Sequence, residues 1–130
     1  MKKDIPIPKV EDVGIAIIPE EDNSWYVYLI NLKDTALDTV LVVSKGYGKV
    51  DDKEVKTSIL RHLFEKVGSR EFVKIELLEK QLHVLSNEFW VSFWHKGTMY
   101  DKKYVFVTDS LSKEHFTNIP LLNKMGVLIK

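Results

Sequence analysis

Aromatic residues gather in one short stretch of the sequence, and this stretch constrains the fold more than any other. Residues 87–107 hold seven of the fourteen aromatic residues in the chain. Large apolar side chains recur at every second position on both sides of Gly97, as they do in two strands joined by a tight turn. The stretch therefore predicts a β-hairpin.

A turn with Gly97 and Thr98 at its centre fixes the residues that face each other across this hairpin. The predicted pairs on one face are Phe89 with Phe106, Val91 with Tyr104, and His95 with Tyr100. The second face carries Trp90, Trp94, Asp101, Lys103 and Val105. Two tryptophans on this second face indicate a surface that is covered, used for binding, or exposed at an energetic cost.

Other segments of the chain also have the composition of strands. They are rich in β-branched and aromatic residues and comprise residues 13–18, 25–32, 39–44 and 72–78, with a short last strand at 126–129. Residues 5–8 alternate isoleucine and proline and predict an extended lead-in. With the hairpin, these segments predict a mainly-β protein, an antiparallel β-sandwich of about seven strands that forms a single domain over residues 1–130.

One segment, residues 54–67, is compatible with two structures. Its apolar residues fall at helical spacing, Asp51 and Glu54 resemble a capping pair, and Gly68 suits the end of a helix. Val55, Thr57 and Ile59 also suit an edge strand. The spacing favours one short helix in residues 54–67, and the strand remains the alternative.

Composition excludes several classes of protein. Nineteen basic and nineteen acidic residues cancel, so no net field attracts nucleic acid or an anionic membrane. The absence of cysteine excludes disulfides and thiol chemistry. The first residues lack the continuous apolar region of a secretory signal, and no apolar run is long enough to span a bilayer. We expect a cytoplasmic protein that does not enter membranes.

The hairpin also carries the candidate surface for a ligand or partner. It combines aromatic and basic residues, namely Trp90, Trp94, Tyr100, Lys102 and Lys103. Nucleic-acid bases stack on exposed rings for about 1–3 kcal/mol each, while lysines contact phosphates. The alternative is that the tryptophans belong to the core. The zero net charge favours this alternative, because nucleic-acid binders usually have an excess of basic residues.

Self-association is another possible use of the apolar surface. Residues 25–32 and 40–43 are apolar on both faces of their predicted strands, which is more than one sandwich face needs. The apolar segment 121–130 either docks on the sheet edge of a neighbouring copy or pairs within its own chain. These features predict a protein partner, most simply a homodimer.

Catalytic and metal-binding patterns receive little support. The only groups that titrate near neutral pH are the histidines, His62, His83, His95 and His115, and they lack the spacing of known metal motifs. No Gly-x-Ser-x-Gly motif is present. The glycines and lysines of residues 44–49 are compatible with phosphate binding but lack a P-loop frame, and they are more typical of the end of a strand. We expect no cofactor, no metal and no catalytic residue.

Several short strings in the sequence resemble a known group of proteins. The strings are TSILRHLFE (57–65), NEFWVSF (87–93), YDKKYVF (100–106), FTNIP (116–120) and NKMGVL (123–128). They resemble short uncharacterised proteins of Bacteroidetes-type bacteria, some of which carry a phenylalanyl-tRNA synthetase alpha-subunit label. The chain is too short for a synthetase core and has no ATP-binding motif, so the resemblance implies no catalysis. A more distant likeness to β-sandwich domains of Smr-associated proteins favours a strand for residues 57–67.

Three functional hypotheses follow from these observations. The first is a non-catalytic β-sandwich interaction module that self-associates. The second is a single-stranded nucleic-acid-binding protein that uses the hairpin at 87–107. The third is a metal-dependent enzyme built around His62, His95 and His115.

Overall fold

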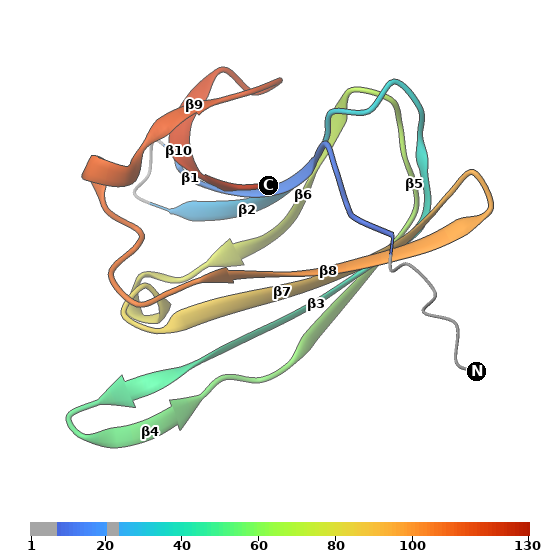
Figure 1. The fold of residues 1–130 in the computed structure, drawn as a ribbon. Helices are drawn as coiled ribbons and strands as arrows, with labels where there is room; N and C mark the ends of the chain where they lie inside the picture. The colour runs from blue at the N-terminus through green and yellow to red at the C-terminus, as the bar shows by residue number, and fades with distance from the viewer. Residues whose placement is uncertain (1–7, 21–23) are drawn as a thin grey trace, which may run out of the picture.

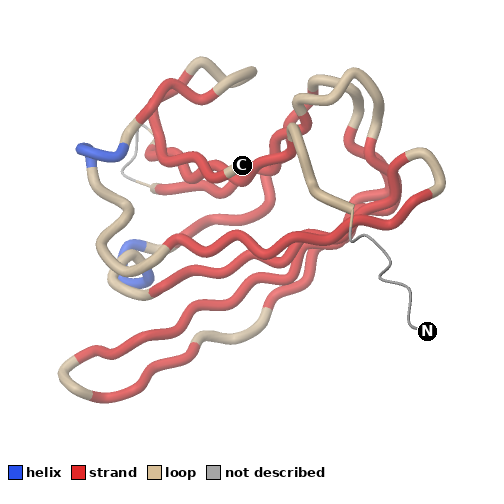
Figure 2. Tube along the Cα trace, viewed as in Figure 1, coloured by secondary structure: helices blue, strands red, loops and turns tan. Residues whose placement is uncertain are grey.

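The protein folds into two stacked antiparallel sheets. The structure, a computed structural model, describes residues 8–20 and 24–130. In that part of the chain there are ten strands and two three-residue 3₁₀ helices, η1 (Lys80–Leu82) and η2 (Lys113–His115), and the strands form two five-stranded sheets (Figures 1 and 2). The predicted mainly-β, antiparallel sandwich is confirmed, with ten strands rather than about seven. Most of the predicted lead-in at 5–8 lies outside the described residues.

Sheet 1 has the strand order β6-β2-β1-β10-β9. Its strands are β1 (Val13–Pro19), β2 (Trp25–Asn31), β6 (Glu71–Leu78), β9 (Thr117–Ile119) and β10 (Lys124–Ile129). Strands β9 and β10 curl over one side of the sheet (Figure 1). Because β10 pairs with β1, with Ile15 opposite Ile129, the segment 121–130 pairs within its own chain and does not supply a strand for a neighbour.

Sheet 2 is built around one long strand, β3 (Leu37–Val50). One edge of β3 pairs with β7 (Ser86–His95), which pairs in turn with β8 (Thr98–Phe106). The other edge pairs first with β5 (Leu60–Val67) and then with β4 (Lys53–Lys56). The far end of β3 and β4 form an arm, residues 48–55, that projects beyond the part of β3 that pairs with β7 (Figure 1).

The β7–β8 hairpin forms as predicted, but its register differs by two residues. His95 lies opposite Thr98, so Lys96 and Gly97 are the central turn residues, with φ of 50° and 77°. Left-handed conformations at both positions are typical of a type I′ turn, and a β-branched residue such as Thr98 is disfavoured there. The observed pairs are Phe89 with Tyr104, Val91 with Lys102, and Phe93 with Tyr100. A shift of two leaves the predicted faces unchanged.

The short helix favoured for residues 54–67 is wrong, because this segment forms β4 and β5. Asp51 and Asp52, with φ of 51° and 62°, form the turn between β3 and β4 rather than a helix cap. On β5, Leu63 points outward opposite Leu41, and Phe64 points inward opposite the buried Val40. A strand with apolar residues on both faces produces neighbouring apolar positions that resemble the spacing of a helix.

The glycines of residues 44–49 lie inside β3 and do not end it, contrary to the prediction. Gly48 is extended, with φ of 159°. Both glycines lie close to neighbouring chain segments: a Cβ at Gly46 would be 3.0 Å from the Thr57 side chain, and one at Gly48 would be 3.2 Å from the Leu85 side chain. Their small size therefore lets β3 continue past neighbouring side chains into the arm.

The main core fills the space between the two sheets. Its largest buried side chains come from both layers and include Ile15, Leu29, Phe89, Phe93 and Tyr104. The Tyr104 hydroxyl donates a hydrogen bond of 2.7 Å to the carbonyl of Val13 and so links β8 to β1. The hairpin face that carries Phe89 is therefore the buried one.

A second, smaller apolar cluster lies on the other side of sheet 1. It consists of Ala16, Ile18, Tyr28, Ile30 and Ile119, with Tyr26, Leu32, Leu121, Leu122 and Leu128 packed against it. The second apolar face of residues 25–32, which suggested a dimer interface, is thus covered by the protein's own β9–β10 region. On the corresponding face of sheet 2, Trp90, Trp94 and Leu63 are exposed.

Candidate functional site

Strand pairing aligns side chains in rows on the side of sheet 2 that faces away from the core. Val43 on β3 stands opposite Trp90 on β7, which stands opposite Lys103 on β8. In the next row, Leu41 stands opposite Leu63 on β5. Because side chains alternate along a strand, these residues share one face and the core residues occupy the other.

Large apolar side chains on this side of sheet 2 are exposed. Leu63 is 67% exposed, Met99 49%, Trp90 and Trp94 44% each, and Leu41 36%. We call this set of five the outer aromatic face. Its exposed apolar area is on the order of 500 Å², the size at which such a patch on a monomer is often functional. No other strand or loop of the described chain covers it (Figure 1).

The structure divides the five residues predicted for the ligand or partner surface between the two faces of the hairpin. Trp90, Trp94 and Lys103 lie on the outer side. Tyr100 and Lys102 lie on the inner side, because β8 alternates and Tyr100 stands opposite the buried Phe93. The rings of Tyr100 and Phe93 stack with centroids 5.4 Å apart.

Three of the five predicted surface residues therefore share the outer side of sheet 2, and the other two lie on its inner side. Leu41, Leu63 and Met99 complete the outer aromatic face but were not predicted for it. Leu63 was missed because its segment was assigned as a helix. Met99 could have been predicted, because it lies on the same face of β8 as Lys103 and Val105.

An ion cluster borders Trp90. The Lys103 ammonium lies 5.1 Å from the centroid of the Trp90 ring, which is a cation–π distance. Beside it, the carboxylate of Glu88, only 7% exposed, lies 3.7 Å from Lys45 and 3.9 Å from Lys103. The Tyr47 hydroxyl donates to the same carboxylate at 3.4 Å. Burial and the neighbouring Glu88 raise the pKa of Tyr47, so its hydroxyl stays protonated at neutral pH.

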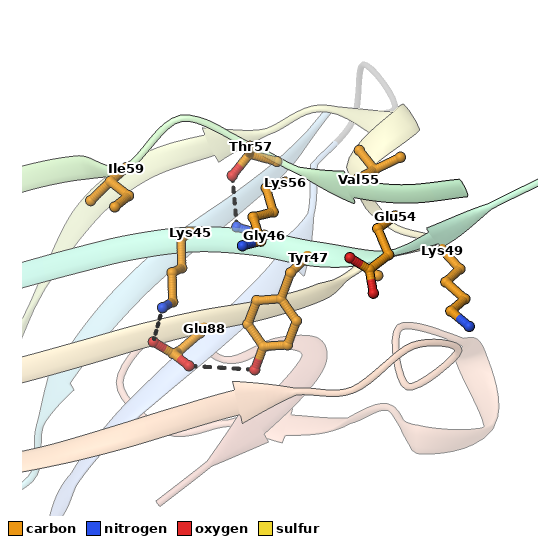
Figure 3. A pocket seen from close by; sticks show the side chains of 11 residues that line it. Lys45, Gly46, Tyr47, Lys49, Glu54, Val55, Lys56, Thr57, Ile59 and Glu88 are labelled. Carbon is orange, nitrogen blue, oxygen red and sulfur yellow. Dashed lines mark hydrogen bonds and ion pairs between the residues drawn. The ribbon is translucent and has the colours of Figure 1, made fainter. Parts of the chain in front are cut away.

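A hollow of about 690 Å³ extends this side of the sheet toward the arm (Figure 3). Its lining side chains include Lys45, Tyr47, Lys49, Lys56, Glu54 and Glu88. Lys45 pairs with Glu88, and Lys49 stands opposite Glu54 across the hairpin. Acidic residues therefore offset the lysines that suggested phosphate binding in residues 44–49, and the hollow carries charges of both signs.

The histidines of the metal hypothesis are not brought together. His62 contacts Glu76 on β6, His95 contacts the Thr35 hydroxyl, and His115 lies beside Glu114 on its own 3₁₀ turn. Across residues 8–20 and 24–130, no three side chains of His, Cys, Asp or Glu are grouped so that they could hold a metal ion. In the same ranges, no helix combines the length and the apolar character that crossing a bilayer requires.

Comparisons with known proteins add no family. A scan of protein-family models gives no match, and searches of curated proteins and of solved structures find no protein with significant similarity. The class is therefore defined by fold and surface alone. The chain is a ten-stranded antiparallel β-sandwich over its described residues. One outer face is covered over β1 and β2 by the β9–β10 region, although Phe72 on the edge strand β6 stays 44% exposed, and the other outer face is uncovered.

Proposed function

We propose that the protein is a non-catalytic interaction module whose outer aromatic face binds a second copy of the same chain. The observation that carries this proposal is the exposure of Trp90, Trp94, Leu63, Met99 and Leu41 on one continuous sheet surface. Burying such a surface is favourable by roughly 25 cal/mol per Å² of apolar area, before the costs of association.

Charge supports a second copy as the partner. Residues of both charges stand around the apolar centre. They include the basic Arg61 and Lys103 and the acidic Asp38 and Asp101, placed by their pairing with Val43, Trp90, Trp94 and Ser92. A rim with both signs suits an isologous contact, in which the same surface meets itself across a two-fold axis. The net charge of zero leaves no long-range repulsion between copies.

Association through the face is also favoured over association through the edge of β8. That edge strand carries Lys102 and Lys103 near its middle, and lysines on an edge strand oppose pairing with another chain. Two copies that pack sheet 2 against sheet 2, about 10 Å apart, would form a four-layered assembly in which the outer aromatic faces become an interior.

The test is the molar mass in solution, measured by light scattering over a wide range of concentration. We expect a monomer–dimer equilibrium for the unchanged protein. Leu63→Glu should give a monomer at every concentration, because it places a charge in the apolar contact. Leu77→Glu is the matched control, since Leu77 is a leucine 45% exposed on sheet 1, and it should still dimerise. A strict monomer for the unchanged protein contradicts the proposal.

A second candidate function, binding of single-stranded nucleic acid, rests on the contact between Trp90 and Lys103. The exposed indole offers a stacking surface for a base, and the ammonium beside it offers a contact for phosphate. Tryptophan fluorescence that is quenched by an oligonucleotide at low salt, with weaker quenching in Lys103→Gln, would favour this function. Fluorescence unchanged by the oligonucleotide excludes it. The acidic residues of the same surface favour the protein partner.

A further inference from the structure

A polar cluster lies between the two sheets, away from the outer aromatic face. Glu76 extends from β6 in sheet 1 toward sheet 2, where the Ser44 hydroxyl donates to Glu76 Oε1 at 2.6 Å. The His62 Nε2 lies 2.9 Å from the same oxygen. The exposed fractions of the Glu76 and His62 side chains are 13% and 25%, and Ser44 as a residue is 4% exposed. Three strands from both layers therefore position one carboxylate.

This carboxylate lines a cavity of about 180 Å³. The volume equals that of about six water molecules at roughly 30 Å³ each, which is enough for a small organic molecule. The apolar part of the wall consists of Leu60, Leu78, Leu82 and Phe89, and the polar part includes Ser44, Thr57, Ser58, Glu76, Glu79 and Asn87. A cavity with apolar walls and a few converging polar groups is the usual form of a small-ligand site.

The polar groups of the wall favour a ligand that donates hydrogen bonds. Both amide hydrogens of Asn87 are directed at the backbone, because its Nδ2 donates to the carbonyls of Leu82 and Leu85. Its carbonyl oxygen and the Glu76 carboxylate remain as acceptors, whereas the exposed Glu79 carboxylate already accepts from Gln81. Lys45 also lines the cavity, but its ammonium is directed to Glu88 on the other side of the sheet, at 3.7 Å.

No lysine or arginine of the described residues forms an ion pair with Glu76. Among the described residues, its ion pair is with His62, whose Nε2 lies 2.9 Å from Glu76 Oε1. A carboxylate held away from water is costly unless it is paired with a positive group. The cluster does not fit a catalytic relay, because Ser44 and His62 both contact the carboxylate and the imidazole does not stand between serine and acid.

We propose that this cavity binds a small organic cation, a primary ammonium on a short apolar chain. The ammonium would contact Glu76 and the Asn87 carbonyl oxygen, and the chain would lie against the leucines and Phe89. This site is separate from the outer aromatic face, so Leu63→Glu, which we expect to prevent self-association, should leave it intact.

The test uses n-butylammonium as the probe and follows amide chemical shifts by NMR. Butanol and butyrate, of similar size, are the controls on the unchanged protein. We expect saturable shifts at residues 44, 57–60, 76–79 and 87 with butylammonium, and no saturation with butyrate. Equal effects of butylammonium and butanol would overturn the proposal, because they would show that the charge is not recognised.

Two variants sharpen the result. Glu76→Gln keeps the size of the side chain and should weaken butylammonium binding by about tenfold or more, the value of one charge-assisted hydrogen bond. His62→Gln removes the competing imidazole and should not weaken binding. Unchanged affinity in Glu76→Gln, or an equal loss in both variants, would contradict the proposal.

Discussion

The two outer faces of the sandwich lie on similar strands, but other segments of the chain pack over one face and leave the other exposed. On sheet 1, Ile18 and Ile30 are completely buried, because β9, β10 and the turn between them pack over them. On sheet 2, Trp90, Trp94 and Leu63 stay exposed, and no described segment packs over them. The difference shows what apolar residues on both faces of a strand can predict. They indicate that something packs on each face, but not whether it is a segment of the same chain or a partner.

The cover of sheet 1 depends on an unusual turn. Leu121 and Asn123 both have positive φ, of 71° and 52°, between β9 and β10. A non-glycine residue in this conformation costs roughly 1 kcal/mol, and asparagine tolerates it better than leucine. Burial of Leu121 and Leu122 against the second cluster offsets that cost.

The largest expected effect contrasts one residue from each outer face. Ile30→Ala should lower the free energy of unfolding by about 3 kcal/mol, because it leaves a cavity in the covered cluster. Leu63→Ala should change the free energy of unfolding by about 0.5 kcal/mol or less, since Leu63 is mostly exposed. Urea denaturation at a concentration where the protein is monomeric measures both. Equal losses would mean that the two faces do not differ.

The next effect concerns the strand that provides the cover. A Cβ at Gly126 on β10 would lie 2.6 Å from the carbonyl oxygen of Ile17, so Gly126→Ala should push β10 away from β1. We expect a loss of about 2 kcal/mol in thermal or chemical unfolding. Gly97→Ala is the control. Its methyl group would meet no atom, and only its positive φ should cost about 1 kcal/mol. A smaller loss at Gly126 than at Gly97 would contradict this account.

A smaller effect lies at the rim of the covered face. The Tyr28 hydroxyl donates to Glu20 at 2.6 Å and, with Lys124, lowers the pKa of that carboxyl. A carboxyl with a lowered pKa stabilises the fold above its ordinary pKa, and this contribution disappears as the pH falls through the folded-state value. Tyr28→Phe should therefore cost about 1 kcal/mol near neutral pH and less in acid. Unfolding curves from about pH 3 to 7 test this, and a pH-independent loss would refute the role of Glu20.

The smallest effect on stability should come from Met99, on the exposed face. Met99→Ser should leave the free energy of unfolding of the monomer within about 0.5 kcal/mol of the unchanged protein. It should nevertheless weaken dimerisation, because it removes apolar surface from the outer aromatic face. Urea denaturation measures the free energy of unfolding, and sedimentation equilibrium measures the strength of dimerisation. A large loss of monomer stability would show that Met99 is covered in solution.

Much of this architecture was predictable from local sequence. Clear alternation at Phe89, Val91 and Phe93 predicted the strand and the residues that share each face, but not which face is buried. The segments around Ile15 and Leu29 predicted two more strands. The register differed because Lys96, rather than Thr98, adopts the left-handed turn conformation. The helix assignment at 54–67 was wrong because the apolar Leu63 points to the exposed face, which a local pattern does not reveal.

The candidate site was less accessible to prediction. Alternation placed Trp90, Trp94 and Lys103 on one side, yet whether that side is covered depends on segments far away in the chain. The cluster of Ser44, His62 and Glu76 had no local signal at all, because its members come from three strands and two sheets. Such a site exists only after the layers stack.

The position of β10 also has a consequence for how the protein is made. β10 lies inside sheet 1 between β1 and β9, yet nearly the whole described chain separates Ile15 from its partner Ile129. During synthesis, β1 and β2 emerge from the ribosome long before the strand that completes their sheet. Pairings between distant residues slow folding and prolong the exposure of unpaired edges. We therefore expect a slow last folding step, and a protein that depends on chaperones more than its size suggests.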